Sequence, residues 1–467
     1  MRSRSVGCHV WWIVFALAGC VLSRTDAAAQ SPGGLLTLND AIQLALKNYP
    51  AIKESRARAQ AAEEGVGVAR TAYLPRLDTI GQVNRATTNN VFGLLLPQSV
   101  IPPITGPVLG TRSLGDSVWG SAAGVLLSWE AVDFGQRKAS VDVARAQTSL
   151  ARNQTALTEL DVAAAAADAF VTVLASDETV RAAQANVERL QVFADNVRAL
   201  VANQLRPGAD ESRANAELAI ARNQVSQAVQ TADIARATLA DAIGAAGRRV
   251  ELAAGGLANL PQTPSPGAED LKSHPAARAE LAAVETVHAR QRLLDRSYFP
   301  HLSFQSAFVG RDSGAQVPGQ LPPGNGLWPQ VPNWAAGLSV TFPAFDFFTV
   351  NARKRVELQN ELAETARYDQ IIQTLTTQDA RAQALMKAAV GIAQNTPLER
   401  QAATAAESQA RARYGSGLAS ITEVAEAQRL LAQAEADDAV ARLGVWRALL
   451  AAAQVRGDLT PFLEQTR

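Results

Sequence analysis

The sequence predicts a mainly helical protein that also carries a few β-strands and is built as an internal tandem repeat. Large apolar residues alternate with small or polar ones over residues 334–342, which is typical of a β-strand with two different faces. A helical pattern of about seventy residues follows at once. The same arrangement occurs earlier in the chain, because GVLLSWEAVDFG at 124–135 corresponds to GLSVTFPAFDFF at 337–348. The constant offset of 213 positions indicates a duplicated unit.

The first 29 residues have the features of an export signal. A positively charged start precedes an apolar run over 10–22, and Ala27-Ala28-Ala29 offers a small-residue cleavage site. The stretch Leu17-Ala-Gly-Cys20 also resembles the acylation motif of a lipoprotein, in which cleavage falls before Cys20 and lipid is attached to it. Both alternatives predict export. Neither leaves a free thiol for disulfides or metals, because the two cysteines of the chain both lie in this region.

The rest of the composition argues against several functional classes. The formal net charge is zero and no basic cluster occurs, so we expect no nucleic-acid partner. The three histidines after the signal, His274, His288 and His301, are too dispersed to predict a metal site. No nucleotide-binding loop and no catalytic triad stands out. The sequence therefore predicts a protein that is not an enzyme and needs no cofactor.

The chain divides into two copies of one unit, each with a β-hairpin and a long helical hairpin. The first copy spans 30–267, with strands at about 77–90 and 117–129, a helical hairpin at about 133–243 and a linker at 244–267. The second copy spans 268–467, with strands at about 302–310 and 334–342 and a helical hairpin at about 346–456. Asp346 stands where the N-cap of the second long helix is expected.

The two helical hairpins are matched in length. The offset of 213 holds from Asp133 and Asp346 to Gly244 and Gly457, so no net insertion separates the hairpins. Loops tolerate insertions, whereas helices packed side by side along their length do not. We therefore expect the hairpins to form coiled-coil-like, equivalent staves of one α-helical tube.

The strands are expected to lie in a membrane. After the signal no run of eighteen apolar residues occurs, so no transmembrane helix is predicted. Alternating strands in an exported chain instead favour the outer membrane. The expected lipid-facing or interfacial girdle side chains are Trp119, Trp129, Trp334, Leu338, Val340 and Phe342.

The expected sheet cannot remain open in lipid, because its edge strands would leave backbone groups unpaired. One chain supplies about four strands, so several chains must share one barrel. Two chains would give an eight-stranded barrel filled by side chains, whereas three would give a twelve-stranded barrel with room for a passage. A homotrimer is the better physical expectation.

The residues resemble a known family, the TolC-like outer membrane efflux proteins, over nearly the whole mature length. These are the outer membrane factors of tripartite efflux and type I secretion systems. The motifs that carry the resemblance are Leu38-NDAIQLALKNYP, Tyr73-LPRLD, Ser128-WEAVDFGQRKAS, His274-PAARAEL, Tyr298-FPHLSF and Tyr414-GSGLASITEVAEAQ. Each is weak alone, but their order and duplication are specific.

The resemblance implies a homotrimeric conduit with a twelve-stranded transmembrane barrel above a long α-helical barrel that crosses the periplasm. It implies a periplasmic adaptor (membrane fusion) protein, an inner-membrane transporter and outer membrane lipids as partners. The alternative is a periplasmic helical-hairpin structural or adaptor protein without a membrane span. The alternating strands, and the lack of a pattern for a lipoyl-like β-domain, favour the conduit.

The resemblance also implies a gate at the hairpin tips. The family motif falls on Tyr414, Gly417, Glu423 and Glu426, and the two glutamates share a helix face at i and i+3. Six carboxylates in a trimer would attract cations and resist closure. Asp210 and Arg213 take the corresponding places in the first copy, where the turn glycine is expected at Gly208. The expected tip or adaptor-docking residues are Gly208, Gly415, Gly417 and Leu418. The plainer alternative makes these ordinary turn residues and solvated surface carboxylates.

Overall fold

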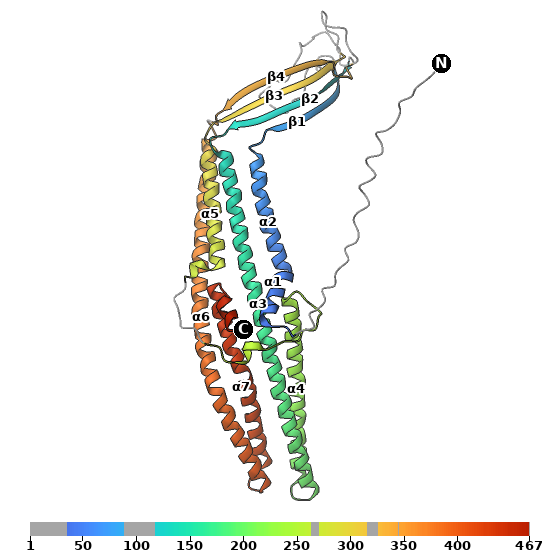
Figure 1. The fold of residues 1–467 in the computed structure, drawn as a ribbon, viewed down its shortest axis with the longest axis vertical. Coiled ribbons are helices and arrows are strands. Elements are labelled where there is room, and N and C mark those ends of the chain that lie inside the picture. The colour runs from blue at the N-terminus through green and yellow to red at the C-terminus, as the bar shows by residue number, and fades with distance from the viewer. Residues whose placement is uncertain (1–34, 88–116, 263–269, 315–325, 344, 467) are drawn as a thin grey trace, which may run out of the picture. The chain divides into compact units, whose positions relative to one another are not determined.

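The structure is a computed structural model that describes residues 35–87, 117–262, 270–314, 326–343 and 345–466 (Figure 1). The expected export signal at 1–29 and the acylation candidate Cys20 lie outside the described residues. The helices and strands described below all belong to one unit, Leu36–Arg467.

Four strands form one antiparallel sheet: β1 (Arg76–Thr87), β2 (Ser117–Val132), β3 (His301–Ser313) and β4 (Val331–Thr341). Their order in the sheet follows their order in the chain (Figure 1), so the two β-hairpins join through β2 and β3. A Cβ atom on Gly124 of β2 would lie 2.4 Å from the carbonyl oxygen of Phe308 on β3. Only glycine therefore allows the two repeats to approach this closely.

Exposure along β4 alternates as the sequence pattern predicts. Trp334 is 78% exposed and Leu338 and Val340 are also exposed, whereas Ala335 and Ser339 between them are half-buried. Successive side chains of a strand point to opposite faces, so β4 has one apolar exposed face.

This apolar face continues across the sheet. The strand register places Trp129 of β2 beside Phe304 of β3, and Phe304 beside Leu338 of β4. The opposite face carries a small buried cluster that contains Ala122, Leu126, Ala307 and Val309. The sheet is thus two-sided throughout.

The long helices form two hairpins, α3 (Gln136–Ala202) with α4 (Gly208–Ala242) and α6 (Phe347–Gly415) with α7 (Ile421–Arg456). The 67 residues of α3 correspond to about 100 Å at 1.5 Å per residue. Two shorter helices follow the same direction, α2 (Pro50–Thr71) against α3 and α5 (Pro275–Arg296) between α3 and α6 (Figure 1). The remaining elements are α1 (Leu38–Asn48), α8 (Thr460–Gln465) and the short 3-10 helices η1 (Gly255–Ala258) and η2 (Leu271–Ser273).

Each repeat has a close joint where one helix ends beside the start of another. At the end of α4, Gly244 has φ +68°, and a Cβ there would lie 2.9 Å from Cβ of Asn48, just before α2. At the end of α7, Gly457 has φ +80°, and a Cβ there would lie 2.9 Å from Cδ2 of His274, just before α5. Both positions therefore need glycine for its backbone conformation and for its size.

The main core surrounds the alanine-rich middle of α3. Ala166, Ala167 and Phe170 are fully buried there and belong to the same apolar cluster as Trp446 of α7. The Trp446 indole N–H donates to the carbonyl oxygen of Asn259 at 2.9 Å, so its polar atom is satisfied. Within the described ranges, none of the helices is both long and apolar enough to cross a membrane.

Asp346 is the N-cap residue of α6, as predicted, but its side chain does not cap the helix. In the first repeat Asp133 accepts hydrogen bonds from the backbone N–H groups of Gly135 and Arg137. Asp346 has a helical backbone and makes no side-chain cap hydrogen bond. The difference follows from the second residue after each aspartate: Gly135 adopts φ +95°, a conformation that its counterpart Phe348 avoids.

Candidate functional site at the hairpin tips

Both long helices that lead into a hairpin tip end in the same turn. Leu205 N–H donates to the Leu200 carbonyl at 2.9 Å after α3, and Leu418 N–H donates to the Arg413 carbonyl at 2.8 Å after α6. This is the Schellman pattern, which needs one residue in the left-handed conformation. The turn satisfies carbonyl groups at the helix end and fixes the direction of the chain at each tip.

The left-handed residues of the two tips correct one sequence expectation. They are Gln204 with φ +60° and Gly417 with φ +77°, which are 213 positions apart. Gly208, the expected turn glycine of the first tip, is instead the first residue of α4, and Gly415 is the last residue of α6. The turn position has therefore not shifted between the repeats; the first copy places glutamine where the second places glycine.

Tyr414 lies at the centre of the apolar packing near the tips. Its side chain is 2% exposed, and its ring lies 5.8 Å from that of Phe193. The surrounding cluster takes buried side chains from α3, α4, α7 and the turn before α7, including Val197, Leu218, Ile421 and Val424. The two hairpins thus share one core near their tips.

Polar contacts to Tyr414 come from the other hairpin. The Tyr414 hydroxyl donates to the Asp210 carboxylate at 2.7 Å. The Arg206 guanidinium lies 4.2 Å from the centre of the tyrosine ring and also donates to the Tyr414 carbonyl oxygen. Burial and the Asp210 carboxylate raise the pKa of Tyr414 to about 12, so the hydroxyl keeps its proton at neutral pH. Tyr414, Asp210 and Arg206 therefore form one connected unit, which we call the tip latch.

The other predicted gate residues lie apart from the latch. Glu423 forms a capping box with Ser420 at the start of α7, and its carboxylate lies 3.6 Å from Arg413. Glu426 and Arg213 are exposed, and neither belongs to the buried cluster. Asp210 and Glu423 occupy equivalent positions but differ in function here, because Asp210 accepts from a tyrosine and Glu423 caps its own helix.

Sequence reasoning missed two tip residues. Leu205 corresponds to Leu418 at the offset of 213, so the repeat could have identified Leu205 as a tip residue. Leu205 is 68% exposed and Leu418 is 71% exposed. Arg206 had no such signal, because the corresponding residue in the second copy is Ala419. Its contacts with Tyr414 depend on how the two hairpins pack.

Ion pairs connect the hairpins above the tips. Arg189 of α3 pairs with Glu435 of α7 at 2.5 Å, and both side chains are partly buried. Arg429 of α7 pairs with Glu217 of α4 at 2.6 Å. These contacts hold α7 against the first hairpin between the tip cluster and the main core.

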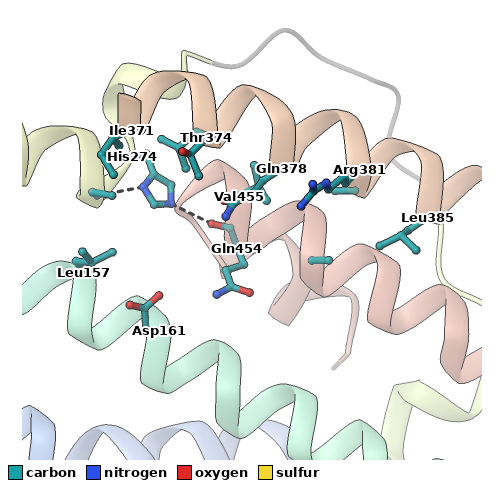
Figure 2. Close-up of a pocket in the computed structure, with 14 residues that line it drawn as sticks. Leu157, Asp161, His274, Ile371, Thr374, Gln378, Arg381, Leu385, Gln454 and Val455 are labelled. Atoms are coloured by element: carbon teal, nitrogen blue, oxygen red, sulfur yellow. Dashed lines mark hydrogen bonds between the residues drawn. The ribbon is translucent and has the colours of Figure 1, made fainter. Parts of the chain in front are cut away.

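A cavity of about 400 Å³ lies where α7 ends and α5 begins (Figure 2). His274, which caps α5, is buried at its edge: its Nδ1 accepts from the Ala276 N–H at 3.1 Å, and its Nε2 lies 3.2 Å from the Gln454 carbonyl oxygen. Burial lowers the pKa of His274, with smaller opposing effects from the hydrogen bond to the Gln454 carbonyl and from Asp161 across the cavity. A neutral imidazole protonated on Nε2 satisfies both contacts, so the histidine serves the joint.

The other two histidines make separate contacts. His288 lies 3.2 Å from Glu361 through Nε2, and His301 lies 2.9 Å from Glu130 through Nδ1. Among the residues that the structure describes, no group of three His, Cys, Asp or Glu side chains is placed to hold a metal ion.

Comparison with known proteins agrees with this architecture. A family profile described as outer membrane efflux protein matches residues 41–245 and 269–457, once in each repeat. The fold is similar to the outer membrane channel OprN (20% identity, 90% of this chain and 89% of that chain, TM-score 0.70). It is similar to the Campylobacter jejuni CmeC outer membrane channel (15% identity, 92% of this chain and 89% of that chain, TM-score 0.72). It is also similar to the open state of the Neisseria gonorrhoeae MtrE channel (20% identity, 90% of this chain and 89% of that chain, TM-score 0.71). No curated protein matches the chain.

Proposed function

This chain belongs to the outer membrane efflux protein family, and we propose that three copies of it form one passage whose periplasmic end is closed by the tip latch. The protein is an outer membrane efflux channel that extends into the periplasm, a transport conduit and not an enzyme. The alternative of a periplasmic structural or adaptor protein without a membrane span is not favoured by the family match.

The sheet supports the trimer. One chain supplies four strands in an open sheet, and the outer edges of β1 and β4 carry backbone groups without a partner within the described part of the chain. Lipid cannot satisfy such groups, so β1 of one copy pairs with β4 of the next. Twelve strands close around a passage, and the lipid-facing or girdle residues cover its outside. Those residues are Trp119, Trp129, Trp334, Leu338, Val340 and Phe342.

The observation that carries the gate is the hydrogen bond from Tyr414 to Asp210. It joins the end of α6 to the start of α4, so the second hairpin cannot leave the first while it persists. Arg206 reinforces this contact from the same hairpin as Asp210. Glu423 and Glu426 line the aperture on the other side of the tip, where their six copies attract cations.

The tips also offer a surface for partners. Leu205, Gly208, Gly415, Gly417 and Leu418 lie at the tips, and the two leucines present large apolar side chains to solvent at equivalent positions. A periplasmic adaptor protein covers these leucines and connects the channel to an inner-membrane transporter. Energy for transport comes from that transporter.

The latch is tested by the Tyr414→Phe variant in a planar bilayer. Phenylalanine keeps the ring in its cluster but removes the hydrogen bond to a charged carboxylate, which is worth about 1.5–3 kcal/mol. We expect the open population, and hence the mean conductance, to rise about tenfold or more. Tyr368→Phe on the same helix removes a hydroxyl outside the latch and is the control. Equal conductance in wild type and Tyr414→Phe would exclude this gate.

The aperture is tested by cation block in a Glu423→Gln, Glu426→Gln double variant. Glutamine can still complete the capping box with Ser420, so only the charge is lost. We expect divalent or trivalent cations to block the variant much more weakly than wild type. The matched control, Asp369→Asn with Glu399→Gln, removes two exposed charges from α6. If both double variants retain the block, the acidic pair does not line the aperture.

A further inference from the structure

Aromatic side chains meet where the strands pass into the helices. Phe134, between β2 and α3, stacks on Phe299, between α5 and β3, with ring centres 6.1 Å apart. The Arg296 guanidinium lies 5.7 Å from the centre of the Phe299 ring. Both rings and the arginine are exposed, although they contact one another. Two segments far apart in the chain thus place apolar and cationic groups together just beyond the sheet.

The start of α6 repeats this combination. Phe348 is 76% exposed in the first turn, and Arg355 is exposed seven residues later. A spacing of seven puts both on one face of the helix. On α5, Arg292 and Arg296 are likewise exposed and four residues apart, within the last turns before β3.

We propose that Phe134, Phe299, Phe348, Arg292, Arg296 and Arg355 form a collar that binds the headgroups of anionic phospholipids in the periplasmic leaflet of the outer membrane. The collar lies at the level where the apolar face of the sheet ends and the periplasmic helices begin. It goes beyond the passage and its gate, because it concerns a lipid ligand held at the outside of the channel.

The charges around the collar favour an anionic partner. Asp133 is paired with Arg137 at 3.1 Å, and Asp295 is paired with Lys354, so these two carboxylates are already neutralised. Asp346 is exposed beside Phe348, and Glu357 is half-buried on α6. The collar arginines have no carboxylate partner among the described residues, so they can contact lipid phosphates.

The chemistry of the collar matches the boundary of a lipid leaflet. The phenylalanine rings supply apolar surface that inserts at the boundary between the headgroups and the acyl chains. Guanidinium groups bind phosphate oxygens through two parallel N–H donors, and they remain charged at all relevant pH values. A zwitterionic headgroup also carries a phosphate, but its own ammonium group balances that charge, so an anionic headgroup is the better counterion for the arginines.

The test is lipid retention by the purified full channel, measured by native mass spectrometry with phosphatidylglycerol and with phosphatidylcholine of the same chain length. We expect tighter binding of phosphatidylglycerol. In the Arg292→Gln, Arg296→Gln, Arg355→Gln variant this preference falls by about fivefold per arginine removed. The single variant Arg355→Gln changes only one exposed side chain, and its preference for phosphatidylglycerol should fall about fivefold. It keeps the proposal testable if the triple variant does not fold.

The matched control removes three exposed charges elsewhere, in an Arg278→Gln, Arg381→Gln, Lys387→Gln variant. It should keep the wild-type preference for phosphatidylglycerol. Wild-type protein that binds both lipids equally, or a control that loses the preference as fully as the collar variant, overturns the proposal. Conductance of the same samples separates this result from a failure of the proposed gate, because a channel that conducts without lipid preference contradicts only the collar.

Discussion

Gln204 and Gly417 show how one backbone conformation is met by two different residues. Both take the left-handed position of a Schellman turn, with φ of +60° and +77°. A side chain in this conformation costs roughly 1–2 kcal/mol, which glycine avoids. A Cβ at Gly417 would meet nothing within 4 Å, so any cost of adding one comes from the backbone and not from a clash.

A pair of glycine substitutions at the second tip separates backbone conformation from crowding. Gly417→Ala should lower the free energy of local opening by about 1 kcal/mol, because alanine disfavours φ near +77°. Gly415→Ala, at a helical position with equally open surroundings, should raise it by about 0.5 kcal/mol. Hydrogen exchange of the tip amides measures both. Changes of the same sign in the two variants would contradict the assignment of the turn.

Equivalent positions in the two repeats also acquire different chemistry. Asp210 accepts a hydrogen bond from a buried tyrosine, whereas Glu423 caps the start of its own helix. Carboxylates at these positions could be predicted from the motif and the offset. Which of them meets Tyr414 could not, because that depends on which hairpin surface packs against the end of α6.

At the scale of elements, the joints between helices are as important as the helices themselves. Gly244 and Gly457 permit α4 and α7 to end directly beside the starts of α2 and α5. The second joint depends in addition on His274, whose two ring nitrogens both have fixed partners. Protonation of Nδ1 would place an N–H against the Ala276 N–H and remove the cap from α5.

The joint at His274 predicts a loss of stability in acid. The pKa of His274 is lowered in the folded state, so the unfolded chain binds protons first as the pH falls. Its contribution is complete above about pH 6.5 and declines as the pH falls from there through the lower folded-state pKa. We expect a loss of about 1 kcal/mol between pH 7 and pH 5.

Thermal denaturation of wild type and His274→Asn across this pH range measures that loss. Asparagine can cap α5 but does not titrate, so the variant should lose less stability in acid than wild type. Arg381 also lines the cavity and is common to both proteins, whereas Asp161 interacts with a charged His274. The difference between the two profiles therefore reports His274 together with its interaction with Asp161. Parallel pH profiles would show that His274 does not carry this dependence.

At the scale of the whole molecule, the open edges of the sheet determine the assembly. We predict that the channel purified in mild detergent has the mass of three chains, because β1 and β4 find partners only in a closed ring. Mass determination by native mass spectrometry or light scattering checks this. A dimer would give eight strands and a filled interior, which is incompatible with a passage.

The sequence by itself determined the fold class, the repeat and the apolar face of the strands. These features follow from local periodicity and from the constant offset, which do not require knowledge of distant contacts. The exposure of Trp334 and Leu338 beside half-buried Ala335 confirms the predicted alternation. The family resemblance is confirmed by a profile match in both repeats.

Only the tertiary structure decided the contacts between segments. The tip latch joins Arg206 and Asp210 to Tyr414 across two hairpins, and the collar joins Phe134 to Phe299 and Arg296 across two strand–helix boundaries. Even the cap at Asp133 and its absence at Asp346 depend on the backbone of the following turn. The latch and the contact of Phe134 with Phe299 join residues far apart in the chain, so short-range patterns carry little information about them, whereas the same patterns are sufficient for helices and strands.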